Sequence, residues 1–224
     1  MKEFIIRIFD FMICSITLLM LLPVLFAIIL ILRLSGEGEI FYGQDRVGRD
    51  GKIFKLLKFA TMQKNSPNIG AGEITLMDDP RVLPFGRILR KSKINEIPQL
   101  LNVLKGDMSI VGPRPMVPDT FLKYPADSRE KINTVLPGLT GIGSIFFRNE
   151  ELYLSNKNNP NKFYDNYIIP YKSQLEVWFV KNNCIKLYCK VIFVTAWVIL
   201  FPNSKILRDY FRGVPSPPKC LDLK

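Results

Sequence analysis

The strongest pattern along the chain is an uncharged apolar run near its N-terminus. Residues 11–32, FMICSITLLMLLPVLFAIILIL, contain no charged side chain over 22 positions. This is about the length that an α-helix needs to cross the hydrocarbon core of a bilayer. The run is too long for a removable signal peptide and lacks a small-residue cleavage site, so it predicts a retained membrane segment.

A proline in this run bears on how the segment sits in the membrane. Pro23 lies near its middle, where it removes a backbone hydrogen bond and favours a kink. Basic residues flank both ends of the run: Lys2, Arg7, Arg33, Arg46 and Arg49. Basic flanks favour the cytoplasmic side, and only a helix that bends at Pro23 and returns satisfies both. We therefore predict a re-entrant membrane helix in residues 1–34, with a simple spanning helix as the alternative.

The pattern changes to short alternating segments after the apolar run. Residues 38–62 alternate apolar and polar side chains, which predicts a small β-hairpin with its turn at 48–52. Residues 64–80 are rich in Asn, Gly, Asp and Pro, which predicts a loop. A short helix is expected from Pro84, since proline suits the first turn of a helix.

A second helix is predicted from Asn95 to Gly106, with Pro98 tolerated in its first turn. Four apolar residues in it follow helical spacing and predict one buried face: Ile97, Leu100, Leu101 and Leu104. The prolines and the glycine of residues 110–118 predict an absence of regular structure there.

The C-terminal third ends in another apolar segment. Residues 185–201 are apolar with lysines at the leading end, which fits either an amphipathic helix lying on the membrane surface or a buried core helix. Trp178 and Trp197 suit a membrane interface. We predict a mainly helical α/β membrane-associated fold, with a cytoplasmic domain in residues 35–212 and a disordered tail in 213–224.

Charge and composition narrow the chemistry. The chain has 31 Lys and Arg against 20 Asp and Glu, a net charge of +11, and no histidine. This balance suits an anionic membrane surface or phosphorylated substrates, and with a membrane segment present it gives no reason to expect nucleic acid as a partner. The four cysteines have no zinc-ligand spacing and are expected to be reduced thiols. Without the usual histidine base, catalysis would rest on carboxylates, basic residues and a metal such as Mg²⁺, as in phosphoryl transfer.

The candidate site lies in residues 91–115, KSKINEIPQLLNVLKGDMSIVGPRP. Prolines on both sides restrict the backbone of Arg114, so its planar fork would lose little entropy on gripping a phosphate. Glu96 lies at a helix start crowded by basic residues and is expected to be ionised. The structural alternatives are a rigid turn with a solvent-facing arginine and a glutamate that only stabilises its helix.

Several segments carry a family resemblance: RIFDF, QDRVG, FKLLKFATM, DDPRVLPFGRILRKSKINEIPQLLNVLKGDMSIVGPRP and PGLTGI. In order and content they resemble the bacterial sugar transferases, the monotopic polyprenyl-phosphate phosphoglycosyl transferases, over about residues 7–148. The chain is similar to the short members with one re-entrant helix. The resemblance implies transfer of a sugar-1-phosphate from a UDP-sugar to undecaprenyl phosphate, with Mg²⁺ and release of UMP. It also implies the cytoplasmic face of the bacterial inner membrane, and a homodimer is compatible with it.

The resemblance also implies roles for individual residues. The catalytic group would be Asn95, Glu96 and Arg114, with Glu96 also a metal ligand. The substrate-binding residues would be Lys58, Arg90, Pro113 and Pro115, and Pro23 would form the membrane kink. Gly141 and Arg148 are further substrate-binding candidates from the residues themselves, with a structured turn and a surface salt bridge as the respective alternatives.

Two positions depart from the family pattern. Leu22 precedes Pro23 where the family often has serine, and Asn95 stands where the family has its aspartate nucleophile. Three interpretations of Asn95 follow. Glu96 takes over the attack or acts as a base in direct transfer to the lipid phosphate, or another acid is recruited from Asp107, Glu150 and Glu151. In the third, the protein is a catalytically silent UDP-sugar-binding or scaffolding protein.

Overall fold

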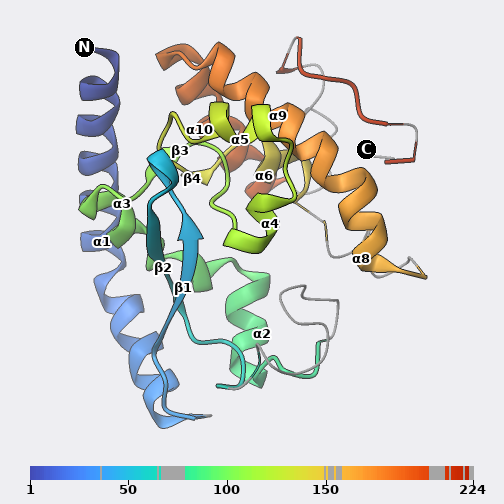
Figure 1. The fold of residues 1–224 in the computed structure, drawn as a ribbon. Helices are drawn as coiled ribbons and strands as arrows, with labels where there is room; N and C mark the ends of the chain where they lie inside the picture. The colour runs from blue at the N-terminus through green and yellow to red at the C-terminus, as the bar shows by residue number, and fades with distance from the viewer. Residues whose placement is uncertain are drawn as a thin grey trace.

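The computed structural model describes residues 1–35, 37–64, 66, 79–148, 150, 154, 158–201, 210–211, 213–218 and 220–221. Helices dominate this part of the chain and the two sheets are small, so the predicted mainly helical α/β class is confirmed (Figure 1). The elements are, in chain order, α1 (Lys2–Leu34), β1 (Phe41–Val47), the turn η1 (Arg49–Gly51), β2 (Ile53–Phe59), α2 (Pro84–Lys91), the 3₁₀ turn η3 (Ile94–Glu96), α3 (Gln99–Lys105), β3 (Ser109–Val111), α4 (Pro118–Leu122), α5 (Ala126–Ile132), β4 (Gly138–Thr140), α6 (Ile142–Phe146), α8 (Pro160–Phe163), the π-helical turn η4 (Tyr164–Ile168), α9 (Ile169–Asn182) and α10 (Ile185–Leu200).

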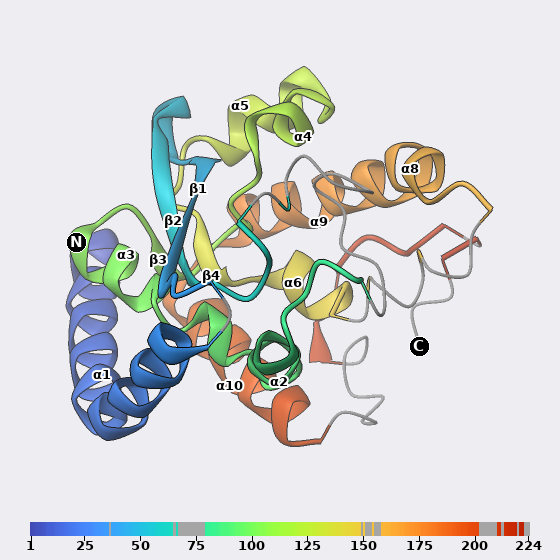
Figure 2. The same cartoon turned by 90° about the horizontal axis from the view of Figure 1, so that it is seen from below.

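Helix α1 is one continuous helix that includes Pro23, and it starts well before the uncharged run. Its ribbon changes direction along its length (Figures 1 and 2). It is roughly 50 Å long at 1.5 Å per residue. Among the described helices it is the one long and apolar enough to cross a bilayer, by length and composition. The long apolar helix indicates association with a membrane.

The first half of α1 is bound to the rest of the protein by polar contacts. The Arg7 guanidinium donates to the carbonyls of Val103 and Leu104 at the end of α3, where it complements the negative end of the helix. The buried carboxylate of Asp10 accepts the N–H of Ile110 in β3 at 3.0 Å. This half of α1 therefore contacts α3, which follows Glu96 in the chain, and β3, which precedes Arg114.

The second half of α1 packs on the same domain through apolar contacts. Ile28 and Leu32 form a buried cluster with Phe59 of β2 and Leu89 of α2. Between the two contact regions, large apolar side chains are exposed: Ile16, Leu19, Met20, Leu22, Val24 and Phe26. Helices α1, α2 and α10 lie toward one side of the molecule, opposite α4 and α5 (Figure 2).

The predicted hairpin is confirmed. Strands β1 and β2 pair antiparallel, with Phe41 opposite Phe59 and Val47 opposite Ile53. The turn falls within residues 48–52, where Asp50 and Gly51 both adopt positive φ. Most of the predicted 64–80 loop lies outside the described residues, whereas the helix predicted from Pro84 is confirmed as α2.

The helix predicted from Asn95 is wrong in its start and in part of its buried face. Asn95 and Glu96 lie in the separate turn η3, Pro98 occupies the cap before α3, and Gly106 ends α3 with positive φ as expected. Leu101 is 43% exposed, while Val103 is fully buried. Helix α3 packs against β2 and α1, and this packing buries Val103 in place of Leu101.

The prediction of no regular structure after Ile110 is wrong at its beginning. Strand β3 pairs in parallel with β4, and the pairing continues through Gly112 N–H to the Thr140 carbonyl at 2.9 Å. Gly138 N–H donates to the Pro113 carbonyl at 2.8 Å. The proline-rich segment is thus held by a strand from a distant part of the chain.

Helix α10 packs one face in the core, as the core-helix interpretation expects, and exposes apolar side chains on another; its contact with a membrane stays a prediction. Val191 and Val194 are fully buried in the main core, while Phe193 and Leu200 are exposed. Trp178 and Trp197 are partly buried. The tail predicted to be disordered is packed in its described part, since Leu221 is buried and Tyr171 Oη donates to the Pro215 carbonyl at 2.8 Å.

Candidate functional site

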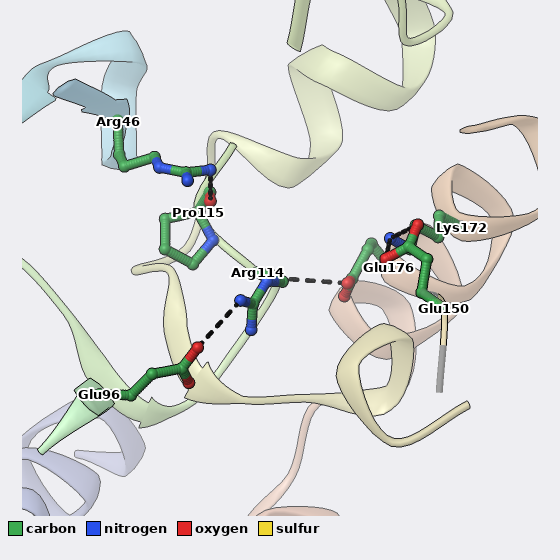
Figure 3. Close-up of polar contacts among 7 residues, drawn as sticks. All are labelled: Arg46, Glu96, Arg114, Pro115, Glu150, Lys172 and Glu176. Atoms are coloured by element: carbon green, nitrogen blue, oxygen red, sulfur yellow. Dashed lines mark hydrogen bonds and ion pairs between the residues drawn. The ribbon is translucent and has the colours of Figure 1, made fainter. Parts of the chain in front are cut away.

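The backbone around Arg114 is held from several sides. Pro113 and Pro115 have no N–H, so Arg114 carries the one backbone donor of the three residues. The Pro115 carbonyl accepts from Arg46 Nη1 at 3.0 Å (Figure 3). The Pro113 carbonyl is bound to β4, so both prolines fix the loop through their carbonyl oxygens. The Arg114 side chain is 44% exposed.

Glu96 and Arg114 form an ion pair at the open side of this loop. Arg114 Nη2 lies 3.3 Å from Glu96 Oε1, and the Glu96 side chain is 20% exposed (Figure 3). Burial alone would raise the pKa of Glu96, but the positive charges of Arg114, Lys58 and Lys93 lower it to about 2. Glu96 is therefore an ionised carboxylate at any physiological pH.

Lys58 of β2 faces the same group of charges. Burial and the charge of Arg46 lower the pKa of Lys58 to about 7, and the charges of Arg114 and Arg90 act in the same direction, while Glu96 opposes them. One carboxylate is thus surrounded by an excess of positive charge. A site of this kind favours a ligand that brings further negative charge, such as a diphosphate.

Asn95 lies beside Glu96 in η3 and is 7% exposed. Its Oδ1 is buried and has no hydrogen-bond partner among the described residues. A buried amide oxygen without a partner is energetically costly. A bound ligand or ion that reached this oxygen would relieve the cost.

The other acids considered from the sequence are bound elsewhere. Both oxygens of Glu150 lie 2.7 Å from Lys172 Nζ, and Asp107 accepts from Asn102 Nδ2 at 3.3 Å beyond the far end of α3. Glu151 lies outside the described residues. Glu150 acts on Arg114 through its charge, but the acid that forms an ion pair with the Arg114 guanidinium is Glu96, so among the described acids the geometry favours Glu96.

Glu176 of α9 is a site residue that the sequence did not reveal. Its side chain is buried and its Oε1 lies 3.4 Å from the Arg114 backbone nitrogen (Figure 3). Burial raises its pKa to about 7, against the Arg114 N–H bond and the charge of Lys172. No motif surrounds it, and it lies 62 positions from Arg114, so no local sequence signal could have identified it.

The remaining predicted site residues have more distant or structural positions. A Cβ on Gly141 would lie 2.1 Å from the Gly112 carbonyl oxygen, so glycine is required there for close packing of backbone on backbone. Arg148 follows α6 with its Nη1 buried and no described contact to Glu96 or Arg114. Arg90 in the last turn of α2 acts on Lys58 through its charge.

The residues present fit a single Mg²⁺ ion completed by substrate. The described part of the chain assembles no group of three or more His, Cys, Asp or Glu. Mg²⁺, however, is commonly held by one or two protein oxygens together with substrate phosphates and water. The ionised carboxylate of Glu96 and the unpartnered Oδ1 of Asn95 provide that kind of oxygen donor.

The fold and the site define a protein with a long apolar helix that indicates membrane association, and with basic residues clustered around one ionised carboxylate. The chain belongs to the bacterial sugar transferase family, whose model matches residues 1–202.

Three relatives illustrate the similarity. Exopolysaccharide production protein ExoY of Sinorhizobium fredii is 39% identical over 161 residues, which is 66% of this chain and 71% of ExoY. The uncharacterized sugar transferase EpsL of Bacillus subtilis is 34% identical over 199 residues, covering 87% and 86% of the two chains. The undecaprenyl-phosphate galactose phosphotransferase of Salmonella typhimurium is 33% identical over 213 residues, which is 89% of this chain but 41% of that relative.

Proposed function

We propose that this protein transfers a sugar-1-phosphate from a UDP-sugar to undecaprenyl phosphate and releases UMP. The observation that supports this most is the ionised Glu96 paired with Arg114 inside a larger basic cluster. Such a cluster neutralises a diphosphate and the charge that develops during phosphoryl transfer. The names of the relatives, which include undecaprenyl-phosphate galactose and glucose phosphotransferases, agree with this class of reaction.

We also propose that α1 is re-entrant on the cytoplasmic face of the bacterial inner membrane, and its contacts support the re-entrant geometry. Arg7 and Asp10 near one end and Ile28 and Leu32 near the other end bind the same domain. A helix that crossed the bilayer would separate its two ends by the membrane thickness and break one set of contacts. The exposed apolar middle of α1 would then lie in the lipid, which brings the site to the level of the acceptor's phosphate.

Glu96 is the residue we assign to the reacting phosphorus atom. In the covalent route, its carboxylate attacks the β-phosphorus of the UDP-sugar, forming an acyl phosphate and breaking the bond to the UMP oxygen. The lipid phosphate then attacks the same phosphorus and restores the carboxylate. In the direct route, an ionised oxygen of the lipid phosphate attacks the β-phosphorus and UMP leaves in one step, while the Glu96 carboxylate stays ionised and orients Arg114. Bound to Glu96, Asn95 and the donor phosphates, Mg²⁺ would neutralise negative charge.

The test is a transfer assay with purified protein in lipid nanodiscs. A panel of UDP-sugars with undecaprenyl phosphate and Mg²⁺ is expected to release UMP with at least one donor, and Glu96→Gln is expected to abolish the release. Intact-mass measurement after incubation with donor alone separates the routes, since only the covalent route adds the mass of a phosphosugar. The competing function is a silent UDP-sugar-binding or scaffolding protein, which Asn95 favours. It is supported if donors bind with no UMP released.

Asn95→Asp supplies the matched comparison for this assay. It restores the acidic pair of the family without changing the size of the side chain. If Glu96 is the nucleophile in the natural protein, Asn95→Asp is expected to change the rate but not to be required for UMP release. Release that occurs only in Asn95→Asp would show that the natural chain is silent.

A further inference from the structure

The Arg114 backbone N–H has an unusual acceptor. Pro113 and Pro115 on either side have no N–H, and their carbonyls bind Gly138 N–H and Arg46. The single backbone donor of the three residues points at the carboxyl of Glu176 rather than at a peptide carbonyl. The loop that presents the Arg114 guanidinium is therefore fixed on its third side by a titratable side chain.

The space around Glu176 is built to hold that carboxyl. Its side chain is 3% exposed on α9. A Cβ on Gly143 in α6 would lie 2.3 Å from Glu176 Oε1, so glycine at this position is what allows the carboxyl to reach Arg114. Its other oxygen, Oε2, is buried and has no partner among the described residues. A purely structural acceptor would need neither an acid nor a second buried oxygen.

The charged and titratable groups around Glu176 come from several segments of the chain. Lys172 lies one turn earlier on α9 and is paired with Glu150, and Arg114 lies on the loop. Tyr124, after α4, is a buried phenol whose pKa is raised by burial, by Tyr164 and by the charge of Glu176. Lys172, whose charge acts on Glu176 from the same helix, is therefore also paired with Glu150.

We propose that Glu176 is a positioning residue for Arg114: its carboxyl anchors the Arg114 N–H, and its ionisation tightens the anchor and so fixes the guanidinium for the reaction. A hydrogen bond to an ionised acceptor is shorter and about twice as strong as one to a neutral acceptor. The present donor–acceptor distance of 3.4 Å leaves room for such tightening. The effect on turnover rests on the proposed transferase function, whereas the anchor itself does not.

The anchor is tested without substrate by NMR. In nanodiscs, protein labelled with ¹⁵N-arginine gives a backbone signal for Arg114, assigned by its loss in Arg114→Lys. We expect the Arg114 amide proton to move downfield as pH rises from 5.5 to 8.5, with a midpoint near 7. Glu176→Gln keeps an oxygen acceptor but has no ionisation, so it should abolish this titration. A titration that persists unchanged in Glu176→Gln would overturn the proposal.

The second arm measures turnover and uses two further variants. The wild-type kcat is expected to rise about fivefold to tenfold through neutral pH, as a charge-assisted hydrogen bond forms, and Glu176→Gln is expected to be flat at the low-pH level. Gly143→Ala displaces the carboxyl from the α6 side and should reproduce both effects. Asp165→Asn removes an acid from an exposed ion pair with Lys123 and should leave the wild-type profile unchanged.

The two arms distinguish the possible failures. An intact Arg114 titration with no UMP release supports the anchor and rejects the transferase. UMP release with a kcat profile that Glu176→Gln does not alter rejects the coupling of Glu176 to catalysis. Thermal unfolding of each variant, compared with the wild type, shows that a changed signal arises in a folded protein.

Discussion

Two glutamates contact the same arginine from opposite sides and differ in their charge. Glu96 meets the Arg114 guanidinium at the open side, among Lys58 and Lys93, and its pKa lies at about 2. Glu176 meets the Arg114 backbone in the interior, and its pKa lies at about 7. Both side chains lose water, but the charges of Arg114, Lys58 and Lys93 outweigh burial at Glu96, whereas burial outweighs those of Lys172 and Arg114 at Glu176.

The difference gives the Arg114 loop two sides with different acid–base properties. The open side concentrates positive charge around an acid that never gains a proton at neutral pH, which suits contact with phosphates. The interior side keeps an acid near its titration point, which suits adjustment of the loop. Arg114 connects the two acids, because its guanidinium contacts Glu96 and its backbone N–H contacts Glu176.

The largest expected effect is the loss of the acid at the open side. Glu96→Gln keeps the size of the side chain but removes the charge, and UMP release should fall at least about 100-fold. The Arg114 amide signal should keep its titration, because Glu176 is unchanged. A fall in rate of less than about threefold would mean that the reacting acid lies elsewhere.

Arg114→Lys separates the two sides of the loop through their shared residue. The lysine keeps the charge and the backbone N–H but loses the planar fork, so turnover should fall about tenfold to 100-fold. The stability of the protein should change little, since the anchor to Glu176 remains. Equal rates for Arg114→Lys and wild type, measured by UMP release, would show that a simple positive charge is sufficient.

The two acids should affect folding stability in separate pH ranges. The pKa of Glu176 is raised from 4.5 to about 7, so the folded state loses stability as pH rises between these values, on the order of 3 kcal/mol. The pKa of Glu96 is lowered to about 2, so its contribution is complete above pH 4.5 and is lost as pH falls below it. Glu176→Gln should therefore remove a decline in thermal stability between pH 4.5 and 8, measured by unfolding in detergent.

The smallest expected effect concerns Lys58. Its pKa of about 7 means that its positive charge is lost as pH rises above neutrality. Lys58→Arg keeps the charge, so at pH 8.5 it should lower the KM for the UDP-sugar about threefold relative to wild type, and change little at pH 6. An unchanged KM at pH 8.5 would show that Lys58 does not contact the donor.

Local signals predicted a large part of the fold. The hairpin turn, the start of α2 at Pro84 and the end of α3 at Gly106 depend on residues close together in sequence, and each prediction is confirmed. The pairing of β3 with β4 depends on residues far apart, and proline-rich composition concealed it. The exposure of Leu101 shows that helical spacing gives a possible face, while the packing partners decide which face is buried.

The sequence predicted the side of the candidate site that contains Glu96 and Arg114, but not the interior side that contains Glu176. The motif that contains both Glu96 and Arg114 placed them at one site, and the structure brings them within 3.3 Å. Glu176 comes from a helix without a motif, and its importance arises from burial and from the absence of a side chain at Gly143. Such properties depend on the folded environment and have no local pattern in the sequence.

The tight contacts of Gly141 have a consequence for mutational scanning of the site. A methyl group at this position would collide with the Gly112 carbonyl two residues before Arg114. A Gly141→Ala variant would therefore lose activity through a shifted loop, and an activity screen alone would score it like the loss of a substrate contact. Separating the two requires a measurement of donor binding or of the Arg114 amide in the same variant, and the same caution applies to Gly112 and Gly138, whose added methyl groups would also meet backbone atoms.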